Sequence, residues 1–186
     1  MRGACCLQRH SLGGSMKHDL SIRSDISSLQ YILDLGIERG DIQDRQLDAT
    51  VEHYFTPVSD EYGCAQYARQ LFMPEGTVCV GKLHKLPHLT FLMQGRVLVV
   101  SENGGKQDLV APVTFVSPAG SKRAFHVLED AILTTVHLTK HNQEEDLSDI
   151  EEEVISPTYS AMGLEEPDLS GLEDFMQTHT LMSEEE

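Results

Sequence analysis

Four side chains that bind anions or metals lie in the middle of this chain. The stretch GKLHKLPHLTFLMQGRV, residues 81–97, carries Lys82, His84 and His88, and Arg123 follows in a later segment. Histidine nitrogens ligate transition metals or act as general bases, whereas lysine and arginine bind carboxylate and phosphate groups. The residue types therefore leave metal binding, acid–base chemistry and anion binding open.

Pro87 decides how the two histidines of this stretch are presented. Histidines four residues apart share one face of a helix, but a proline inside a helix lacks an N–H and clashes with the preceding turn. Two short strands joined at Leu86–Pro87 explain the pattern better. Lys82 and His84 would then share a face of the first strand by alternation, and His88 would open the second strand.

The sequence around these residues predicts an all-β domain over residues 51–141. The segments TVCVGKL, HLTFLMQ, RVLVVS, APVTFVS and AILTTVHL are short, rich in Val, Leu, Thr and Phe, and separated by turn residues. Between two of them, ENGGKQ has the Asn-Gly pair that favours a hairpin turn. Short strands at this spacing are typical of a β-sandwich or a β-barrel.

The segments before the barrel are predicted to differ from each other. Residues 1–20 are expected to be a disordered extension, with either Met1 or Met16 as the true start. Residues 21–50 are expected to be helical, because Ile26, Leu29 and Ile32 recur at helical spacing after capping residues, with Gly36 as a stop.

An acidic segment follows the barrel. From residue 144 to the end there are 15 Asp and Glu and no Lys or Arg. Like charges repel one another and bury little surface, so residues 142–186 are expected to be a disordered tail. Within it, DLSGLEDFM places apolar residues at helical spacing. That peptide is either solvated or binds a groove of a protein partner.

Charge and cysteine usage exclude several classes of protein. Residues 1–143 are close to neutral, which argues against binding of nucleic acid through phosphates. No apolar run is long enough to cross a membrane, and the opening residues lack the apolar core of a secretory signal. Four cysteines without regular spacing suit free thiols in a reducing cytoplasm.

The central segment resembles the cupins, a superfamily of small β-barrels with two sequence motifs. In the first motif, G-x5-H-x-H-x3,4-E-x6-G, Gly95 matches the last glycine and His84 the second histidine. His88 then stands in place of the glutamate and Lys82 in place of the first histidine. In the second motif, Pro118-Ala119-Gly120 matches the P-x-G core, and Arg123 stands in place of the final histidine. The resemblance implies a jelly-roll-like barrel over about residues 55–140.

The departures from the motifs bear on cofactors. In metal-dependent cupins three His and one Glu hold a divalent ion, whereas this chain has Lys82 and Arg123 at two of those positions. A positive charge about 5 Å from a divalent ion costs about 6–7 kcal/mol at an effective dielectric near 20. We therefore expect no metal cofactor and a pocket for a small anionic ligand formed by Lys82, His84, His88 and Arg123. If a metal does bind, the expected ligands are His84, His88 and His126.

Two functions remain open. The wording of the chain is also similar to uncharacterised cupin-like proteins of tailed bacteriophages, which implies a non-catalytic accessory protein of the host cytoplasm. By analogy with cupins it would form a homodimer. The alternative is a cupin enzyme of the isomerase, epimerase or metal-dependent oxygenase type that uses His84 and His88. The accessory function is the preferred interpretation, because no carboxylate is evident in the motif to orient a catalytic base.

Overall fold

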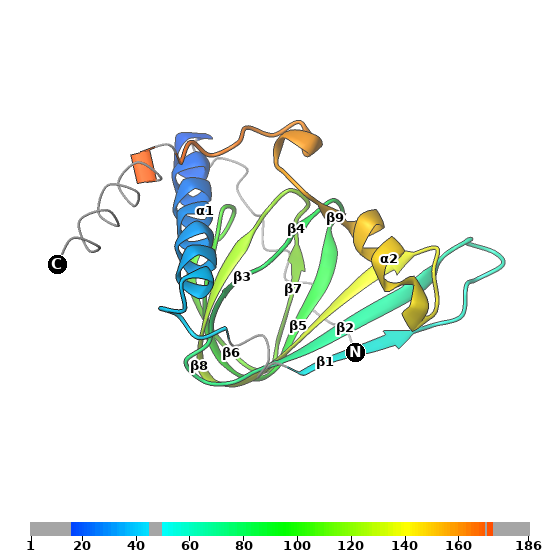
Figure 1. Cartoon of the computed structure of the whole chain (residues 1–186). Coiled ribbons are helices and arrows are strands. Elements are labelled where there is room, and N and C mark those ends of the chain that lie inside the picture. Colours follow the sequence, from blue (N-terminus) through cyan, green and yellow to red (C-terminus); the bar gives the residue numbers. More distant parts are fainter. Residues whose placement is uncertain (1–15, 45–49, 170, 173–186) are drawn as a thin grey trace, which may run out of the picture.

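The computed structural model describes residues 16–44, 50–169, 171 and 172 (Figure 1). The expected disordered extension falls largely on residues 1–15, which lie outside the described residues. The helices and strands run in the order α1 (Met16–Glu38), β1 (Thr50–Phe55), β2 (Ala65–Met73), β3 (Val78–Val80), β4 (Leu83–His84), β5 (His88–Ser101), β6 (Gly105–Val110), β7 (Val113–Ser117), β8 (Arg123–Thr139), α2 (Leu147–Val154) and β9 (Ile155–Ser156).

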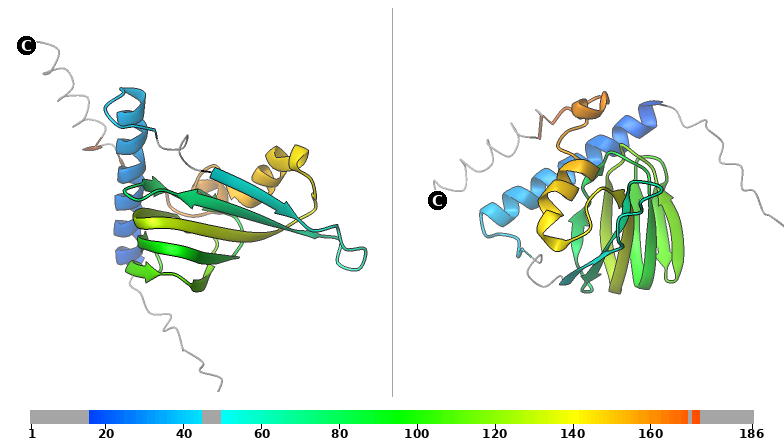
Figure 2. Two further views of the ribbon diagram at one scale, coloured as in Figure 1. Left: turned by 90° about the horizontal axis from the view of Figure 1, so that it is seen from below. Right: turned by 90° about the vertical axis from the view of Figure 1, so that its right-hand side faces the viewer.

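One antiparallel sheet of seven strands forms the body of the molecule. Its main path is β1-β2-β8-β5-β6, with β3 added to β8 and β7 added to β5. The long strands β8 and β5 lie at its centre and pair over most of their length. The sheet curves, and both helices pack against it (Figure 2). This arrangement confirms the predicted all-β barrel with a preceding helix.

The core fills the interior of the curved sheet. Leu92, Val97 and Val99 of β5 alternate inward and meet Val127 of β8, all with 1 % exposure or less. Gly95 lies beside a register shift between the two strands, at a φ of +83°. A Cβ there would lie 2.3 Å from the carbonyl oxygen of Asp130, so the close approach of β5 to β8 requires glycine.

Helix α1 closes one end of the barrel. Ile22 and Ile26, one helical turn apart, are buried against Ala124, with Leu29 packed beside them. The helix begins at Met16, eight residues before the capping residue expected from the sequence, and ends at Glu38. The reason for the longer helix is tertiary contact, because its first described turns continue to face the barrel.

The structure differs from the expected tail over residues 144–169, which we call the C-terminal strap. This segment contains α2 and β9 and lies against the barrel (Figure 1). Ile150 and Val154 of α2 are 1 % and 6 % exposed and pack on Tyr67 of β2, and Tyr159 is 2 % exposed. Burial of these apolar side chains outweighs the repulsion among the acidic residues, which face solvent. The peptide DLSGLEDFM, residues 168–176, falls only in part within the described residues.

Within the described residues, no helix combines the length and apolar character needed to cross a lipid bilayer.

Candidate functional site: a three-histidine cluster in the barrel

Three histidines from three strands meet inside the barrel. His84 is on β4, His88 begins β5, and His137 lies near the end of β8. Their ring centroids are 4.1 Å (His84–His88), 4.9 Å (His84–His137) and 4.5 Å (His88–His137) apart. One ring nitrogen from each lies within 4.8 Å of the other two. This spacing brings three potential metal ligands to one point.

The strand register explains why His88 and His137 are neighbours. Leu89 of β5 pairs with Val136 of β8, so the preceding residue of β5 lies beside the following residue of β8. Alternation then points both imidazoles inward, where His88 is 8 % and His137 7 % exposed. The predicted break at Leu86–Pro87 is confirmed, since β4 ends at His84 and β5 begins at His88.

The environment keeps all three imidazoles neutral. Burial lowers the pKa of His84 to about 3, with further lowering by the charges of His88, His137 and Arg123. Burial, followed by His88, lowers the pKa of His137 to about 4, and burial also lowers the pKa of His88. Because neutral imidazole is the form that ligates metals, the cluster is ready to bind a cation at neutral pH.

A nitrogen of His84 lacks any partner. Its Nδ1 is buried and has no hydrogen bond to the residues that the structure describes. A buried polar atom without a partner costs free energy, and such atoms are few in folded proteins. The other side of the cluster is better satisfied, because Nδ1 of His88 lies 3.4 Å from the carbonyl oxygen of Leu86. The orphaned nitrogen is therefore the one that a bound ion or ligand would satisfy.

Arg123 adds a positive charge beside the cluster. Its guanidinium is half-buried, lies 5.3 Å from the centre of the Phe115 ring, and has a pKa lowered by burial. A salt bridge to Glu129 or Asp130 is the bland alternative for this arginine. No carboxylate among residues 16–44 and 50–169 forms an ion pair with it. A half-buried guanidinium without a counter-charge is a candidate anion site.

Two of the residues singled out by the sequence lie away from the cluster. Lys82 precedes β4, and its Nζ forms an ion pair with Glu151 of α2, with both side chains more than half exposed. His126 lies on β8 opposite Val78 and is exposed, so it does not face the barrel interior. The structure thus brings together His84, His88 and Arg123, and adds His137, which sequence analysis would treat as an ordinary strand histidine. No local signal identifies His137, because its position depends on the β5–β8 register.

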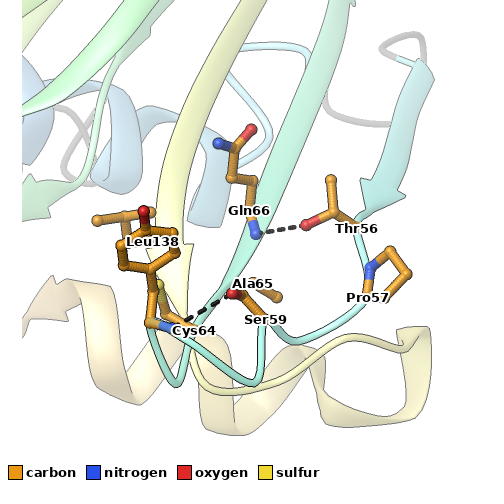
Figure 3. Close-up of a pocket in the computed structure, with 8 residues that line it drawn as sticks. Thr56, Pro57, Ser59, Cys64, Ala65, Gln66 and Leu138 are labelled. Carbon is orange, nitrogen blue, oxygen red and sulfur yellow. Dashed lines mark hydrogen bonds between the residues drawn. The ribbon is translucent and has the colours of Figure 1, made fainter.

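A separate cavity lies at the far end of the β1–β2 hairpin (Figure 3). It has a volume of about 330 Å³, and the hairpin loop that borders it is held by hydrogen bonds from Gln66 N to Thr56 Oγ1 (2.8 Å) and from Ser59 N to Cys64 O (2.9 Å). Leu138 follows His137 in β8 but points to the opposite face of the strand. No charged side chain lines this cavity, so we do not place the functional site there.

Comparisons with known proteins give similarity of fold only. No family model and no curated protein sequence matches the chain. Among solved structures, KdgF from Halomonas sp. is 19% identical and has a TM-score of 0.42, over 55% of this chain and 88% of that protein. A cupin superfamily protein from Desulfitobacterium hafniense is 17% identical and has a TM-score of 0.38, over 48% and 77%. Salicylate 1,2-dioxygenase from Pseudoaminobacter salicylatoxidans is 13% identical and has a TM-score of 0.43, over 67% and 34%.

Proposed function

We propose that this chain is a cupin-type barrel that binds a divalent transition metal through His84, His88 and His137, and a small anionic ligand beside it. The observation that carries the proposal is the cluster of three neutral imidazoles with one nitrogen each within 4.8 Å. Imidazole ligands suit zinc, iron, nickel and copper, and three protein ligands leave coordination positions open for water or ligand. A metal in this position would act as a Lewis acid toward whatever occupies the open positions.

The position of Lys82 removes one objection to a metal. Two fixed positive charges near the ion would oppose binding strongly, but Lys82 is paired with Glu151 on the surface. Arg123 alone remains, and its repulsion is relieved when an anion lies between the guanidinium and the metal. Metal and anion binding are therefore expected to reinforce each other. A carboxylate or phosphate group fits both the planar guanidinium and an open coordination position.

A second candidate function is the non-catalytic accessory role, of the kind implied by the resemblance to phage proteins, with an anion held in the barrel and no metal. It is favoured by the surroundings of the histidines, because no carboxylate among the described residues bonds to any of the three. An enzyme that used one of these histidines as a general base would need such an orienting group. The homodimer and a protein partner of residues 142–186 are further proposals of this model of function.

Metal and anion titrations separate the two candidates. The protein is stripped with chelator, and its melting temperature is measured with Zn²⁺, Ni²⁺ or Mn²⁺, with phosphate or succinate, and with both together. The metal function predicts stabilisation by metal that is lost in His137→Ala and retained in His126→Ala, the matched control on the exposed face of the same strand.

The anion arms test Arg123. Stabilisation by phosphate or succinate is expected to be lost in Arg123→Ala and retained in Arg96→Ala, which removes an exposed arginine. Anion stabilisation without any response to metal would support the accessory function instead. A protein that responds to neither metal nor anion would refute both candidates.

A further inference from the structure

His84 is held differently from the other two histidines of the cluster. His88 and His137 belong to β5 and β8, which pair with each other and with further strands of the main sheet. His84 belongs to β4, which pairs within the described chain only with β9 of the C-terminal strap. The register matches His84 with Ile155, and the Lys85 amide donates to the carbonyl oxygen of Val154 at 2.8 Å.

The barrel itself gives β4 little support. Within the described residues, the backbone contact printed between His84 and the rest of the barrel is one hydrogen bond, from the Gly120 amide to the His84 carbonyl oxygen at 2.9 Å. Gly120 in turn lies against the strap, because a Cβ at that glycine would meet Leu164 at 2.7 Å. The position of His84 thus depends on the strap from two sides.

The strap is fastened at several points on either side of β9. Before it, Ile150 and Val154 are buried against Tyr67, and Glu153 accepts a hydrogen bond from Thr139 Oγ1 at 2.7 Å. After it, the Tyr159 hydroxyl donates to Glu102 Oε1 at 2.7 Å. These contacts fix β9, and β9 fixes β4.

We propose that the C-terminal strap positions His84 for the cluster, so that docking of the strap and binding of metal are thermodynamically coupled. This inference rests on the proposed function and deepens it. When the strap is released, β4 loses its strand partner and the cluster keeps only His88 and His137. By linkage, a ligand bound to all three histidines stabilises the docked strap, and anything that lifts the strap weakens the binding of that ligand.

Ile150→Asp releases the strap by placing a carboxylate at a position that is 1 % exposed. Ser148→Asp is the matched control, because it adds the same group to an exposed position of the same helix. Co²⁺ is titrated into the chelator-stripped full-length variants and followed by visible absorption. Ile150→Asp is expected to weaken Co²⁺ binding by about 10–100-fold and to give the spectrum of His84→Ala, because both leave two imidazoles. Ser148→Asp is expected to match the wild type.

Amide hydrogen exchange provides a readout that needs no metal. In Ile150→Asp the Lys85 amide is expected to exchange faster, whereas the amides of β5 and β8 around His88 and His137 stay protected. If Ile150→Asp does not fold, Tyr159→Phe, which removes one fastening, is expected to change both readouts in the same direction by less.

The outcomes distinguish the inference from the function on which it rests. Wild-type affinity for Co²⁺ in a variant whose strap exchanges freely would overturn the inference while the metal function stood. If the wild type binds no Co²⁺, the metal function is refuted, and an unchanged Lys85 exchange rate in Ile150→Asp would overturn the positioning role as well.

Discussion

Glu102 joins three parts of the molecule through one buried carboxylate. Its side chain is 3 % exposed and accepts hydrogen bonds from Arg23 Nε of α1 at 2.9 Å and from the Tyr159 hydroxyl of the strap at 2.7 Å. The Arg23 guanidinium also lies 4.4 Å from the centre of the Tyr159 ring, and its side chain is 10 % exposed. The nearby carboxylate, together with burial, raises the pKa of Tyr159, so this hydroxyl stays a donor at any ordinary pH.

Replacing Glu102 with Gln keeps the shape of the side chain and removes its charge. The Arg23 cation is then left buried without a counter-charge, a situation that costs about 3–5 kcal/mol when one partner of a buried ion pair is lost. For a chain of this size the melting temperature is expected to fall by roughly 6–20 °C. Urea denaturation followed by circular dichroism gives the free energy of unfolding directly.

Asp108→Asn is the matched control for this prediction. Asp108 accepts two hydrogen bonds from Arg96, at 2.9 and 2.6 Å, but both side chains are 43 % exposed. An exposed pair contributes about 0.2–1 kcal/mol, so the control is expected to lose less than 1 kcal/mol. Adding Arg23→Met to Glu102→Gln removes the unpaired charge and is expected to restore part of the loss. The reasoning is refuted if Glu102→Gln costs no more than Asp108→Asn.

Two further predictions concern the cluster and the barrel. The metal-free protein is expected to lose about 2–4 kcal/mol of stability between pH 7 and pH 5, because the pKa values of His84 (about 3) and His137 (about 4) lie below the unfolded value of 6.5 and protons bind preferentially to the unfolded chain. Urea unfolding at the two pH values measures this loss, and a protein more stable at pH 5 would contradict it. Gly95→Ala is expected to cost more than the about 1–2 kcal/mol of a left-handed backbone, since its Cβ would overlap the carbonyl oxygen of Asp130. Gly105→Ala, with φ +61° and open space around it, is expected to cost only that amount, and equal losses in thermal unfolding would refute the overlap argument.

Local patterns were enough to predict the barrel and part of the cluster. The alternation of apolar residues and the break at Pro87 predict the strands that carry His84 and His88, because both signals arise from neighbouring residues. His137 joins the cluster through pairing of β8 with β5, which are far apart in the sequence. That register cannot be read from one sequence, and His137 was therefore missed.

The strap was missed for a related reason. Its composition is that of a solvated acidic segment, and average charge outweighs the few apolar residues in any compositional argument. Ile150, Val154 and Tyr159 are nevertheless spaced so that each reaches a buried position on a surface formed by distant parts of the chain. The ion pair of Lys82 with Glu151 is a consequence of the same docking and takes that lysine away from the barrel interior.

The connectivity of β8 also constrains how the chain can fold. This strand pairs with β2, β3 and β5, all of which precede it in the sequence, so the sheet cannot close until residues 123–139 are in place. Before that point only the β1–β2 hairpin and the β5–β6–β7 segment can form their own ladders. Pairings between distant segments must overcome the entropy of closing long loops, which places refolding in the range of milliseconds to seconds typical of non-local β topologies. During synthesis the unpaired edges of β2 and β5 are therefore exposed until β8 emerges, which makes this interval the stage at which aggregation is most favourable.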